Sequence, residues 1–348
     1  MKAQTNPITR FLLFLMIVCV TGATLSGCGL LKRSTPRPAA AAPATAIPST
    51  TPSPTNTPTL IPTTIPSATL TPTPTSTPMP PVVIESVPIT SRYLGNSREL
   101  SIYLPADYSS QRYAQRRFKV LYSNDGQDLP IMGLEQYLNG FYASNQMEQI
   151  IVVAIPANDD NRTNEYGTGP IKNADGMGAD AQAYLNFLFN EVIPLVNSQY
   201  RTLTGPQNTG YMGWSLGGLT AFYAAWQHPE VFGIVGSISG SFWWRTNINS
   251  LQELLNSRVI IKMVREDTLH PALRMWFSAG TNEDTNDRDK NGVIDMVQDT
   301  TDLLAELTKK GYQNGVDFIY EQVEGGTHEL ASFTKVLPDF LRWAFPPK

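Results

Sequence analysis

Cysteine and histidine are both scarce in this sequence of 348 residues, which contains 2 cysteines and 3 histidines. Cys19 lies in an N-terminal apolar run that we expect to be removed, so no pair remains for a disulfide in a folded domain. Charged residues are also few, at 16%, and lysine plus arginine (26) do not outnumber aspartate plus glutamate (30). Without a basic excess, and with no basic cluster beyond Lys32 and Arg33, nucleic acid is not an expected partner.

The N-terminal apolar run, residues 11–20, is too short to span a bilayer as a stable helix and is typical of a signal-peptide core. Residues 25–28 (LSGC) then resemble a bacterial lipobox, in which the cysteine is lipidated and becomes the new N-terminus. We therefore predict a lipoprotein signal over residues 1–27 and a lipid anchor at Cys28, which would hold the protein outside the cytoplasm on the cell membrane or envelope. The alternative is an ordinary secretory signal followed by an unmodified cysteine.

Residues 28–81 are rich in proline, threonine and serine, with few charges and almost no large apolar residues. Such a composition cannot bury a core, so we predict an extended tether. At about 3.1 Å per residue, a tract of this kind reaches roughly 140 Å. A spacer of defined reach and a linker without a length requirement both fit it. Residues 82–348 have ordinary globular composition without a second linker, which predicts one large domain.

Within residues 82–348, candidate strands alternate with candidate helices. Continuous apolar runs at 118–122 and 150–155 are typical of strands buried on both faces, and 98–104 alternates as a half-exposed strand. Further expected strands are 209–212, 234–238, 274–278 and 318–323, and the expected helices are 181–196, 219–227, 300–310 and 333–345. This order predicts an α/β fold with a mostly parallel central sheet covered by helices, and ligand sites at the carboxyl ends of the strands.

The most informative motif is at residues 213–217 (GWSLG). A G-x-S-x-G pattern between a strand and a helix is typical of a nucleophile elbow, which would place Ser215 on a strained turn. Gly213 and Gly217 lack the bulk that would keep strand and helix apart. The same geometry aims the Leu216 amide, at the start of the helix, toward an oxyanion beside Ser215. The alternative is a glycine-rich turn that only caps a helix.

A serine hydroxyl becomes a nucleophile when a neutral imidazole accepts its proton. His228 lies at the far end of the helix that follows the elbow, and His270 precedes a proline in a loop. His328 follows a predicted strand in a glycine-supported loop at the strand's carboxyl end. We therefore predict His328 as the general base.

A carboxylate must also hold the imidazole in the correct tautomer. In this fold class the acid lies on a loop between the serine and the histidine in chain order. Glu283 and Asp284 follow the predicted strand that ends at residue 278. Either side chain can fill this role on these grounds.

Together with the elbow, several segments make residues 82–348 resemble the esterase D, feruloyl esterase, enterochelin esterase-like and antigen 85 group of α/β-hydrolases. The segments are 103–105 (YLP), 121–128 (LYSNDGQD), Arg162 with Glu165 and Tyr166, 239–244 (SGSFWW) and 325–329 (GGTHE). The resemblance implies that the Gln127 amide is the second oxyanion donor. It also favours Glu283 as the acid and leaves Asp284 as the second candidate.

The combined pattern implies a secreted, lipid-anchored carboxylic ester hydrolase that forms an acyl-enzyme on Ser215 without an organic cofactor. Acyl transfer to a sugar hydroxyl, as in the antigen 85 branch, and a surface binding module that has lost the chemistry are the alternatives. Trp214, Trp243 and Trp244 are predicted to form a substrate wall, with core packing as the alternative for the last two. The expected substrate is a small-molecule or polysaccharide-linked ester whose acyl and alcohol parts the sequence does not specify.

A second motif, residues 287–298, resembles an EF-hand calcium loop. The predicted ligands at positions one, three, five, seven and nine are Asp287, Asp289, Asn291, the Val293 carbonyl and Asp295. Position twelve is Gln298 instead of a bidentate glutamate, so the coordination is either incomplete or completed from elsewhere. We predict a weakly bound structural Ca²⁺ that stiffens the segment presenting Glu283. A solvated acidic loop is the alternative.

Overall fold

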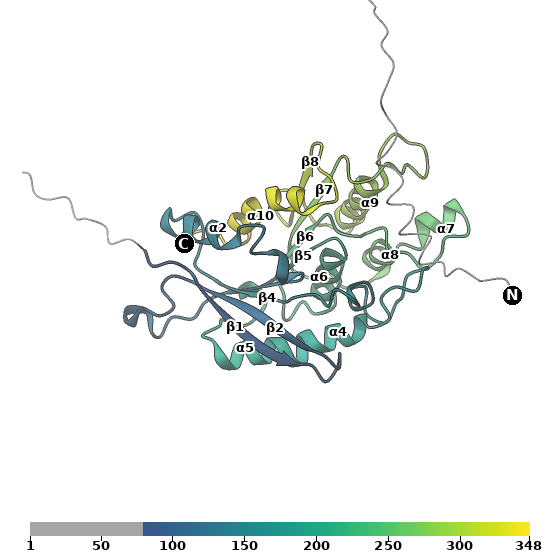
Figure 1. Cartoon of the computed structure of the whole chain (residues 1–348). Coiled ribbons are helices and arrows are strands. Elements are labelled where there is room, and N and C mark those ends of the chain that lie inside the picture. Colours follow the sequence, from purple (N-terminus) through teal and green to yellow (C-terminus); the bar gives the residue numbers. More distant parts are fainter. Residues whose placement is uncertain (1–78) are drawn as a thin grey trace, which may run out of the picture. The chain divides into compact units, whose positions relative to one another are not determined.

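The computed structural model describes residues 79–348, whose strands form an eight-stranded sheet in the order β1-β2-β4-β3-β5-β6-β7-β8 (Figure 1). In chain order these are β1 (Val83–Thr90), β2 (Ser97–Leu104), β3 (Val120–Ser123), β4 (Ile151–Ala154), β5 (Thr209–Trp214), β6 (Ile234–Ile238), β7 (Arg274–Gly280) and β8 (Phe318–Val323). β1 and β2 pair antiparallel, and the strands from β3 to β8 pair parallel. The predicted α/β fold with a mostly parallel sheet is confirmed. The predicted signal, the Cys28 anchor and most of the tether lie outside the described residues.

Side chains of the central strands alternate between two hydrophobic cores, one on each face of the sheet. Val120 and Tyr122 of β3 belong to one core, whereas Leu121 belongs to the other. All four residues of β3 and of β4 are buried, because helices cover both faces. This is why β4 is apolar throughout and β3 is apolar up to Ser123, its last residue.

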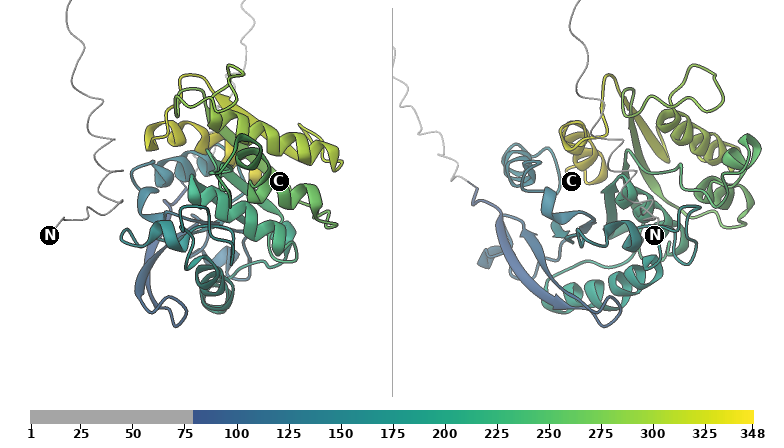
Figure 2. Two further views of the ribbon diagram at one scale, coloured as in Figure 1. Left: turned by 90° about the vertical axis from the view of Figure 1, so that its right-hand side faces the viewer. Right: turned by 45° about the vertical axis from the view of Figure 1, so that its right-hand side comes forward.

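The helices are α2 (Leu134–Ala143), α3 (Arg162–Glu165), α4 (Ala181–Phe187), α5 (Ile193–Gln199), α6 (Leu216–Gln227), α7 (Leu251–Asn256), α8 (Val259–Glu266), α9 (Asp295–Lys309) and α10 (Leu330–Ala344). Apolar residues of α2 and α10 belong to the core that contains Leu121. Residues of α4, α5, α6, α8 and α9 belong to the core on the opposite face, and Figure 2 shows both layers. The sheet is therefore the middle layer of three.

Several elements differ from the expected ones. The expected helix 181–196 is interrupted by a π-helical turn, η3 (Leu188–Val192), which separates α4 from α5. Helix α9 begins at Asp295, five residues before the predicted start, so it starts inside the predicted calcium loop. β1 was not predicted, because most of its residues are exposed on an edge of the sheet and its sequence contains Pro88.

The carboxyl ends of the parallel strands lie at the same edge of the sheet, and every predicted catalytic residue follows such an end. β5 ends just before Ser215, β7 ends before Glu283, and β8 ends before His328. The short 3-10 helix η2 (Gly126–Asp128) follows β3 at the same edge. Parallel pairing thus gathers residues that are far apart in the sequence.

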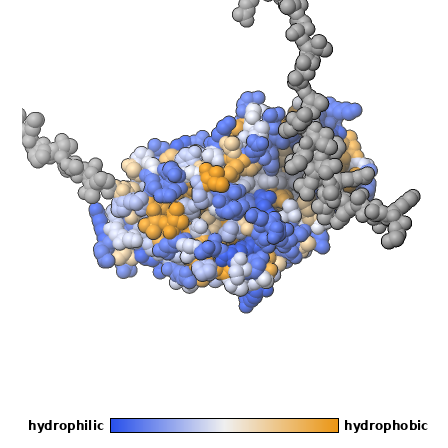
Figure 3. Space-filling view, in the orientation of Figure 1, coloured by the Kyte–Doolittle hydropathy of each residue, from blue (hydrophilic) through white to orange (hydrophobic). Residues whose placement is uncertain are grey.

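The face shown in Figure 3 is mostly hydrophilic, with small apolar areas that are separate from one another. Large apolar side chains that remain exposed in the described part of the chain include Ile131, Ile248 and Val316. No helix in residues 79–348 has both the length and the apolar character needed to cross a membrane.

Candidate active site

Ser215 occupies a strained turn between β5 and α6. Its backbone has φ 55° and ψ −127°, which a residue other than glycine rarely adopts. The Ser215 amide donates a hydrogen bond to the Ile238 carbonyl oxygen at 3.0 Å. A Cβ at Gly213 would lie 2.6 Å from the Gly217 carbonyl carbon, so the predicted close approach of strand and helix does require glycine there.

The structure brings Ser215, His328 and Glu283 into one hydrogen-bonded chain. His328 Nε2 lies 2.9 Å from Ser215 Oγ, and His328 Nδ1 lies 2.7 Å from Glu283 Oε2. The Glu283 side chain is 1% exposed and that of His328 is 33% exposed. The imidazole therefore sits between a buried carboxylate and a hydroxyl that solvent can reach.

Of the two acidic candidates, Glu283 is the one at the imidazole. Its second oxygen, Oε1, accepts a hydrogen bond from Ser239 Oγ at 2.7 Å and another from the Gly280 amide. Asp284 Oδ1 instead accepts the Asn286 amide at 3.2 Å, and partial burial raises the pKa of the Asp284 carboxyl. Glu283 thus has both of its oxygens engaged by groups that orient it.

The loops that carry the acid and the histidine are tied directly to each other. A Cβ at Gly280 would lie 2.3 Å from the Gly326 carbonyl oxygen, which only glycine permits. The Asn282 amide donates to the same carbonyl at 2.8 Å, and the Gly325 amide donates to Thr281 Oγ1 at 2.8 Å. These contacts set the distance between Glu283 and His328 through the backbone.

The amides predicted to bind an oxyanion belong to Gln127 and Leu216. Neither has a backbone acceptor within residues 79–348, so both are available to a ligand. Gln127 is held in place because its Oε1 accepts the Ala157 amide at 2.9 Å. A Cβ at Gly126 would lie 2.5 Å from the Ala154 carbonyl carbon, so the turn before Gln127 presses against the end of β4.

The predicted tryptophan wall is corrected for two of its three members. Trp244 is fully buried, and its indole N–H donates to the Ile171 carbonyl oxygen at 3.3 Å, so it belongs to the core. Trp214 is 3% exposed, with its ring centroid 6.4 Å from that of Phe333. Only Trp243 among the three is partly exposed. Their position in the sequence, next to strand ends at the active edge, did not show that the side chains of Trp214 and Trp244 are covered by other parts of the protein.

The other two histidines make contacts of their own. His228 Nδ1 lies 3.0 Å from Glu230 Oε1 at the carboxyl end of α6. The His270 ring stacks on Tyr312 with centroids 4.3 Å apart. These contacts agree with the choice of His328 as the candidate base.

Residues 287–293 of the predicted calcium loop are held in a turn by hydrogen bonds among themselves. The Asp287 carboxylate accepts the amides of Asn291 and Gly292 at 3.0 and 2.9 Å. Its pKa is lowered, chiefly by the bond from the Gly292 amide. Val293, the position expected to offer its carbonyl, donates its amide to Asn291 Oδ1 at 2.8 Å. The Asp287 carboxylate, at position one of the loop, is therefore already bound by the backbone of positions five and six.

Two other predicted ligands, Asp289 and Asp295, have protein partners of their own. Asp289 Oδ2 accepts the Gln298 side-chain amide at 2.7 Å, and Asp295 Oδ1 lies 3.2 Å from Arg288 Nε. No group of three or more His, Cys, Asp or Glu side chains in residues 79–348 is placed to hold a metal ion. One Asp289 oxygen and the Gln298 side-chain oxygen are buried without a partner there, which leaves two oxygens free for a cation. The calcium site stays a prediction.

Two residues of the site were not assigned a role from the sequence. Asp125 is 1% exposed, and its two carboxylate oxygens accept Nε and Nη2 of Arg162 at 2.6 and 2.8 Å. Both belong to motifs that carry the family resemblance, and the Asn-Asp-Gly turn at residues 124–126 was the available signal for Asp125. Their partnership across 37 residues of chain appears only in three dimensions.

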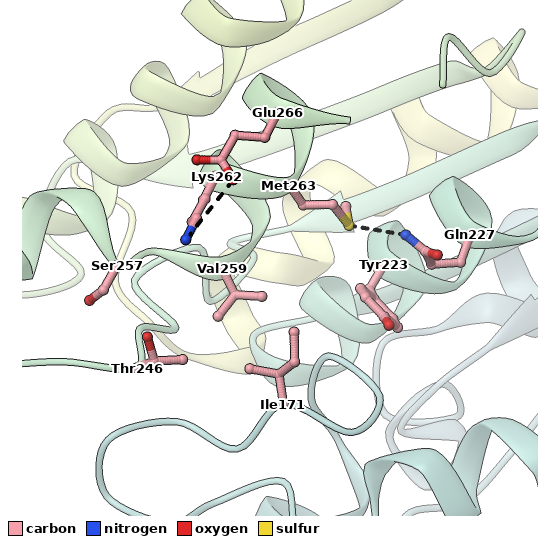
Figure 4. A pocket seen from close by; sticks show the side chains of 9 residues that line it. All are labelled: Ile171, Tyr223, Gln227, Thr246, Ser257, Val259, Lys262, Met263 and Glu266. Carbon is pink, nitrogen blue, oxygen red and sulfur yellow. Dashed lines mark hydrogen bonds and ion pairs between the residues drawn. The ribbon is translucent and has the colours of Figure 1, made fainter. Parts of the chain in front are cut away.

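A separate cavity of about 310 Å³ lies beside α6 and α8 (Figure 4). Its lining residues are Ile171, Tyr223, Gln227, Thr246, Ser257, Val259, Lys262, Met263 and Glu266. None of the candidate catalytic residues is among them, and Lys262 and Glu266 face each other at 4.0 Å. The chemistry of the site therefore rests on the hydrogen-bonded residues around Ser215 and not on this cavity.

Comparison with known proteins gives the family. A family model described as putative esterase matches residues 91–344. The uncharacterized protein YbbA of Bacillus subtilis is 26% identical over 261 residues, which cover 73% of this chain and 95% of that protein. A solved enterobactin esterase from Shigella flexneri has a TM-score of 0.59 at 23% identity, covering 76% of this chain and 60% of that one.

A second solved structure, a ferulic acid esterase from the anaerobic fungus Anaeromyces mucronatus, has a TM-score of 0.54 at 17% identity. That match covers 75% of this chain and 90% of the fungal one. Both structures support the fold, and the family model extends over nearly all of the described domain. The chain therefore belongs to the putative esterase family and is a carboxylic ester hydrolase with the α/β-hydrolase fold.

Proposed function

We propose that this protein is a lipid-anchored, extracytoplasmic serine esterase that works through an acyl-enzyme on Ser215. The observation that carries the proposal is the position of His328 between Ser215 Oγ at 2.9 Å and Glu283 Oε2 at 2.7 Å. Both distances are within hydrogen-bond reach, as proton transfer between nucleophile and base requires.

In the proposed reaction, Ser215 Oγ attacks the ester carbonyl carbon while His328 Nε2 takes the hydroxyl proton. The tetrahedral intermediate collapses when the protonated His328 donates that proton to the leaving alcohol, which breaks the carbon–oxygen bond. Water then attacks the acyl-enzyme, His328 accepts a proton from it, and the carboxylic acid leaves with Ser215 restored. Glu283 holds the imidazole in the required tautomer and stabilises its positive charge.

The oxyanion that forms in both steps is assigned to the amides of Gln127 and Leu216. The Leu216 amide is at the first residue of α6, where the helix has its partial positive charge. Removal of one such donor typically costs about 10²- to 10³-fold in kcat. The free state of both amides supports this assignment.

The substrate class is proposed from the relatives. One structural neighbour is named as a ferulic acid esterase, and ferulic acid is an aromatic acid. Another, the enterobactin esterase, was solved in the presence of 2,3-dihydroxy-N-benzoyl-glycine, which also carries an aromatic ring but binds it through nitrogen. We propose an aromatic acyl ester, either free or attached to a polysaccharide. Hydrolysis of feruloyl esters should then exceed that of acetyl esters of the same alcohol, and equal rates would count against this class.

The lipid anchor rests on the sequence pattern at residues 25–28. Expressed in a bacterium, the full chain should fractionate with membranes and incorporate labelled fatty acid. The Cys28→Ala variant should lose both properties, and membrane retention of that variant without label would remove the support for the anchor.

The test of the mechanism compares wild type with Ser215→Ala on a short-chain nitrophenyl ester. We expect kcat to fall by about 10⁴-fold or more, and a fluorophosphonate to label wild type only. Glu283→Gln should lose about 10³- to 10⁴-fold, since the amide favours the wrong tautomer. Asp284→Asn is the matched control and should stay within about threefold of wild type. Equal losses in both acidic variants would contradict the assignment of Glu283.

A further inference from the structure

The backbone at Asp125 holds one half of the candidate oxyanion hole. Asp125 has φ 52° and ψ 41°, a left-handed conformation that directs the chain into the turn at Gly126 and Gln127. Its amide donates to Tyr166 Oη at 3.0 Å, and its carbonyl accepts the Asp128 amide at 3.0 Å. The left-handed form costs roughly 1–2 kcal/mol for a residue with a side chain, so these contacts must hold it.

The Asp125 side chain also contacts the segment that carries the other half of the candidate oxyanion hole, the Leu216 amide at the start of α6. A Cβ at Gly217 would lie 2.8 Å from Asp125 Oδ2, so the carboxylate rests on the first turn of α6, next to Leu216. Asn124 adds a second tie, because its Nδ2 donates to the Gly217 carbonyl oxygen at 2.8 Å. The segments that carry the two free amides are therefore joined through residues 124 and 125.

Arg162, from α3, binds Asp125 from the side that is nearer to solvent. Its guanidinium binds both Asp125 oxygens, and Nη2 is also 3.5 Å from the carbonyl oxygen of Trp214, the residue before Ser215. The Arg162 side chain is 25% exposed, whereas that of Asp125 is 1% exposed. A fork of this kind fixes the plane of the carboxylate, which a single point charge does not do.

The positive charge of Arg162 also matters, because it lies beside the Asp125 carboxylate. The Asp125 carboxylate is buried beside the place where negative charge develops on the substrate, and an unpaired carboxylate there would oppose that charge. The paired guanidinium cancels it. The pair is thus placed to affect the transition state more than the bound substrate, which carries no such charge.

From this geometry we infer that Asp125 and Arg162 are positioning residues that align the Gln127 and Leu216 amides and neutralise the carboxylate beside the oxyanion. This inference rests on the proposed serine esterase mechanism. A second ion pair at α3, Arg98 with Glu165 at 2.5 Å, is buried on both sides and makes no such contact with the elbow. If both ion pairs only stabilised the fold, the Arg162–Asp125 pair would need no more contact with the elbow than the Arg98–Glu165 pair has.

The experiment uses the full chain with Arg162→Gln, Arg162→Lys, Asp125→Asn and the double variant Asp125→Asn/Arg162→Gln. Arg274→Gln is the control for the loss of a guanidinium elsewhere, because Arg274 donates to the backbone carbonyls of Trp343 and Ala344 from the start of β7, whereas Ser215 follows the end of β5. Steady-state kinetics on a nitrophenyl ester, active-site titration with a fluorophosphonate, and the affinity for an arylboronic acid are measured for each. Thermal unfolding identifies variants that fail to fold.

We expect Arg162→Gln to lose about 100-fold in kcat with KM within about threefold, since it leaves the carboxylate uncompensated. Asp125→Asn should lose about 10-fold, and the double variant should resemble it instead of showing the product of both losses. Arg162→Lys should be intermediate because it keeps the charge without the fork. Boronic acid affinity should fall in parallel with kcat/KM, and Arg274→Gln should alter unfolding alone.

Additive losses in the double variant would overturn the charge argument, and a rise in KM at constant kcat would make Arg162 a substrate contact instead. Unchanged kcat per titrated site in any folded variant of either residue would overturn the whole inference. If Ser215→Ala kept wild-type activity in the same assay, the proposed function itself would fail. Loss in Ser215→Ala together with normal Arg162 and Asp125 variants would leave that function standing and reject only the positioning role.

Discussion

Strain at the scale of single residues is concentrated around Ser215. Five residues other than glycine have positive φ in the described part of the chain, and three of them, Asp125, Ser215 and Ser239, belong to the site. Each such conformation is unfavourable and persists only where the surroundings hold it. Ser239 has φ 47° and donates its hydroxyl to Glu283, so its strain places a hydrogen bond on the acid.

Asp284 offers a prediction about pH at this scale. Burial, opposed by the Asn286 amide and reinforced by the nearby carboxylates of Asp295 and Asp299, raises its pKa in the folded state. The ionised form therefore costs stability at every pH above the folded pKa, and this cost disappears below the unfolded value of about 3.9. Asp284→Asn should be more stable than wild type at pH 7, with the gain shrinking as the pH falls toward 4.

Urea unfolding of both proteins between pH 4 and pH 7.5 measures this difference. The asparagine keeps an acceptor oxygen for the Asn286 amide. A loss of stability of the same size at all pH values would show that the carboxylate makes contacts other than those described.

At the scale of elements, the connection between β7 and α9 carries both the acid and the candidate calcium loop. Asp295, position nine of the predicted loop, is the first residue of α9. Arg288 Nε lies 3.2 Å from Asp295 Oδ1, so one predicted ligand is already paired with an arginine. Calcium would have to draw Asp295 away from this arginine.

The calcium prediction is tested by thermal unfolding in 10 mM Ca²⁺ and in chelator. Extracellular sites bind with Kd of about 10⁻⁴ to 10⁻³ M, so saturation should stabilise the fold by about 1–3 kcal/mol and raise Tm by several degrees. Asp287→Asn should abolish the shift. Asp302→Asn, which changes a partly exposed acid outside the loop, should retain it. Superimposable curves for wild type with and without calcium would rule the site out.

At the scale of the whole molecule, a buried ion network joins segments from both sides of the acid loop. Asp299 of α9 is 1% exposed and accepts Arg258 Nη1 at 2.5 Å and Arg288 Nη2 at 2.6 Å. Arg245, which follows β6, donates to its other oxygen at 3.3 Å. One carboxylate thus joins α9, the start of α8, the candidate calcium loop and the segment that follows Trp244.

Asp299→Asn should therefore destabilise the fold by about 3–5 kcal/mol, because it leaves buried guanidinium groups without their partner. Asp302→Asn is the matched control: it removes a carboxylate 2.7 Å from the same Arg258, but one that is 39% exposed. We expect this control to cost less than about 1 kcal/mol. Free energies of unfolding from urea titrations measure both, and equal losses would mean that burial of the Asp299 pair does not matter.

The pattern of apolar and polar residues within short stretches of sequence was enough to predict much of the fold. The run at 150–155 is apolar at every position and the run at 118–122 at every position except Lys119, because helices cover both faces of the strands there. The strands β6 and β8 have the predicted bounds. α2 escaped prediction, as did α7 and α8 with their many polar residues. Their burial depends on what packs against them, which no window of sequence contains.

The sequence by itself determined the class of fold, the elbow at Ser215 and the choice of His328, because strand periodicity and glycine placement are local properties. Only the tertiary structure shows which of Glu283 and Asp284 contacts His328, namely Glu283. The two are adjacent in the chain, and the difference comes from Ser239 and His328, which other strands bring to the same edge of the sheet. The burial of Trp244 and the pairing of Asp125 with Arg162 were decided in the same way, since both depend on contacts between segments distant in sequence.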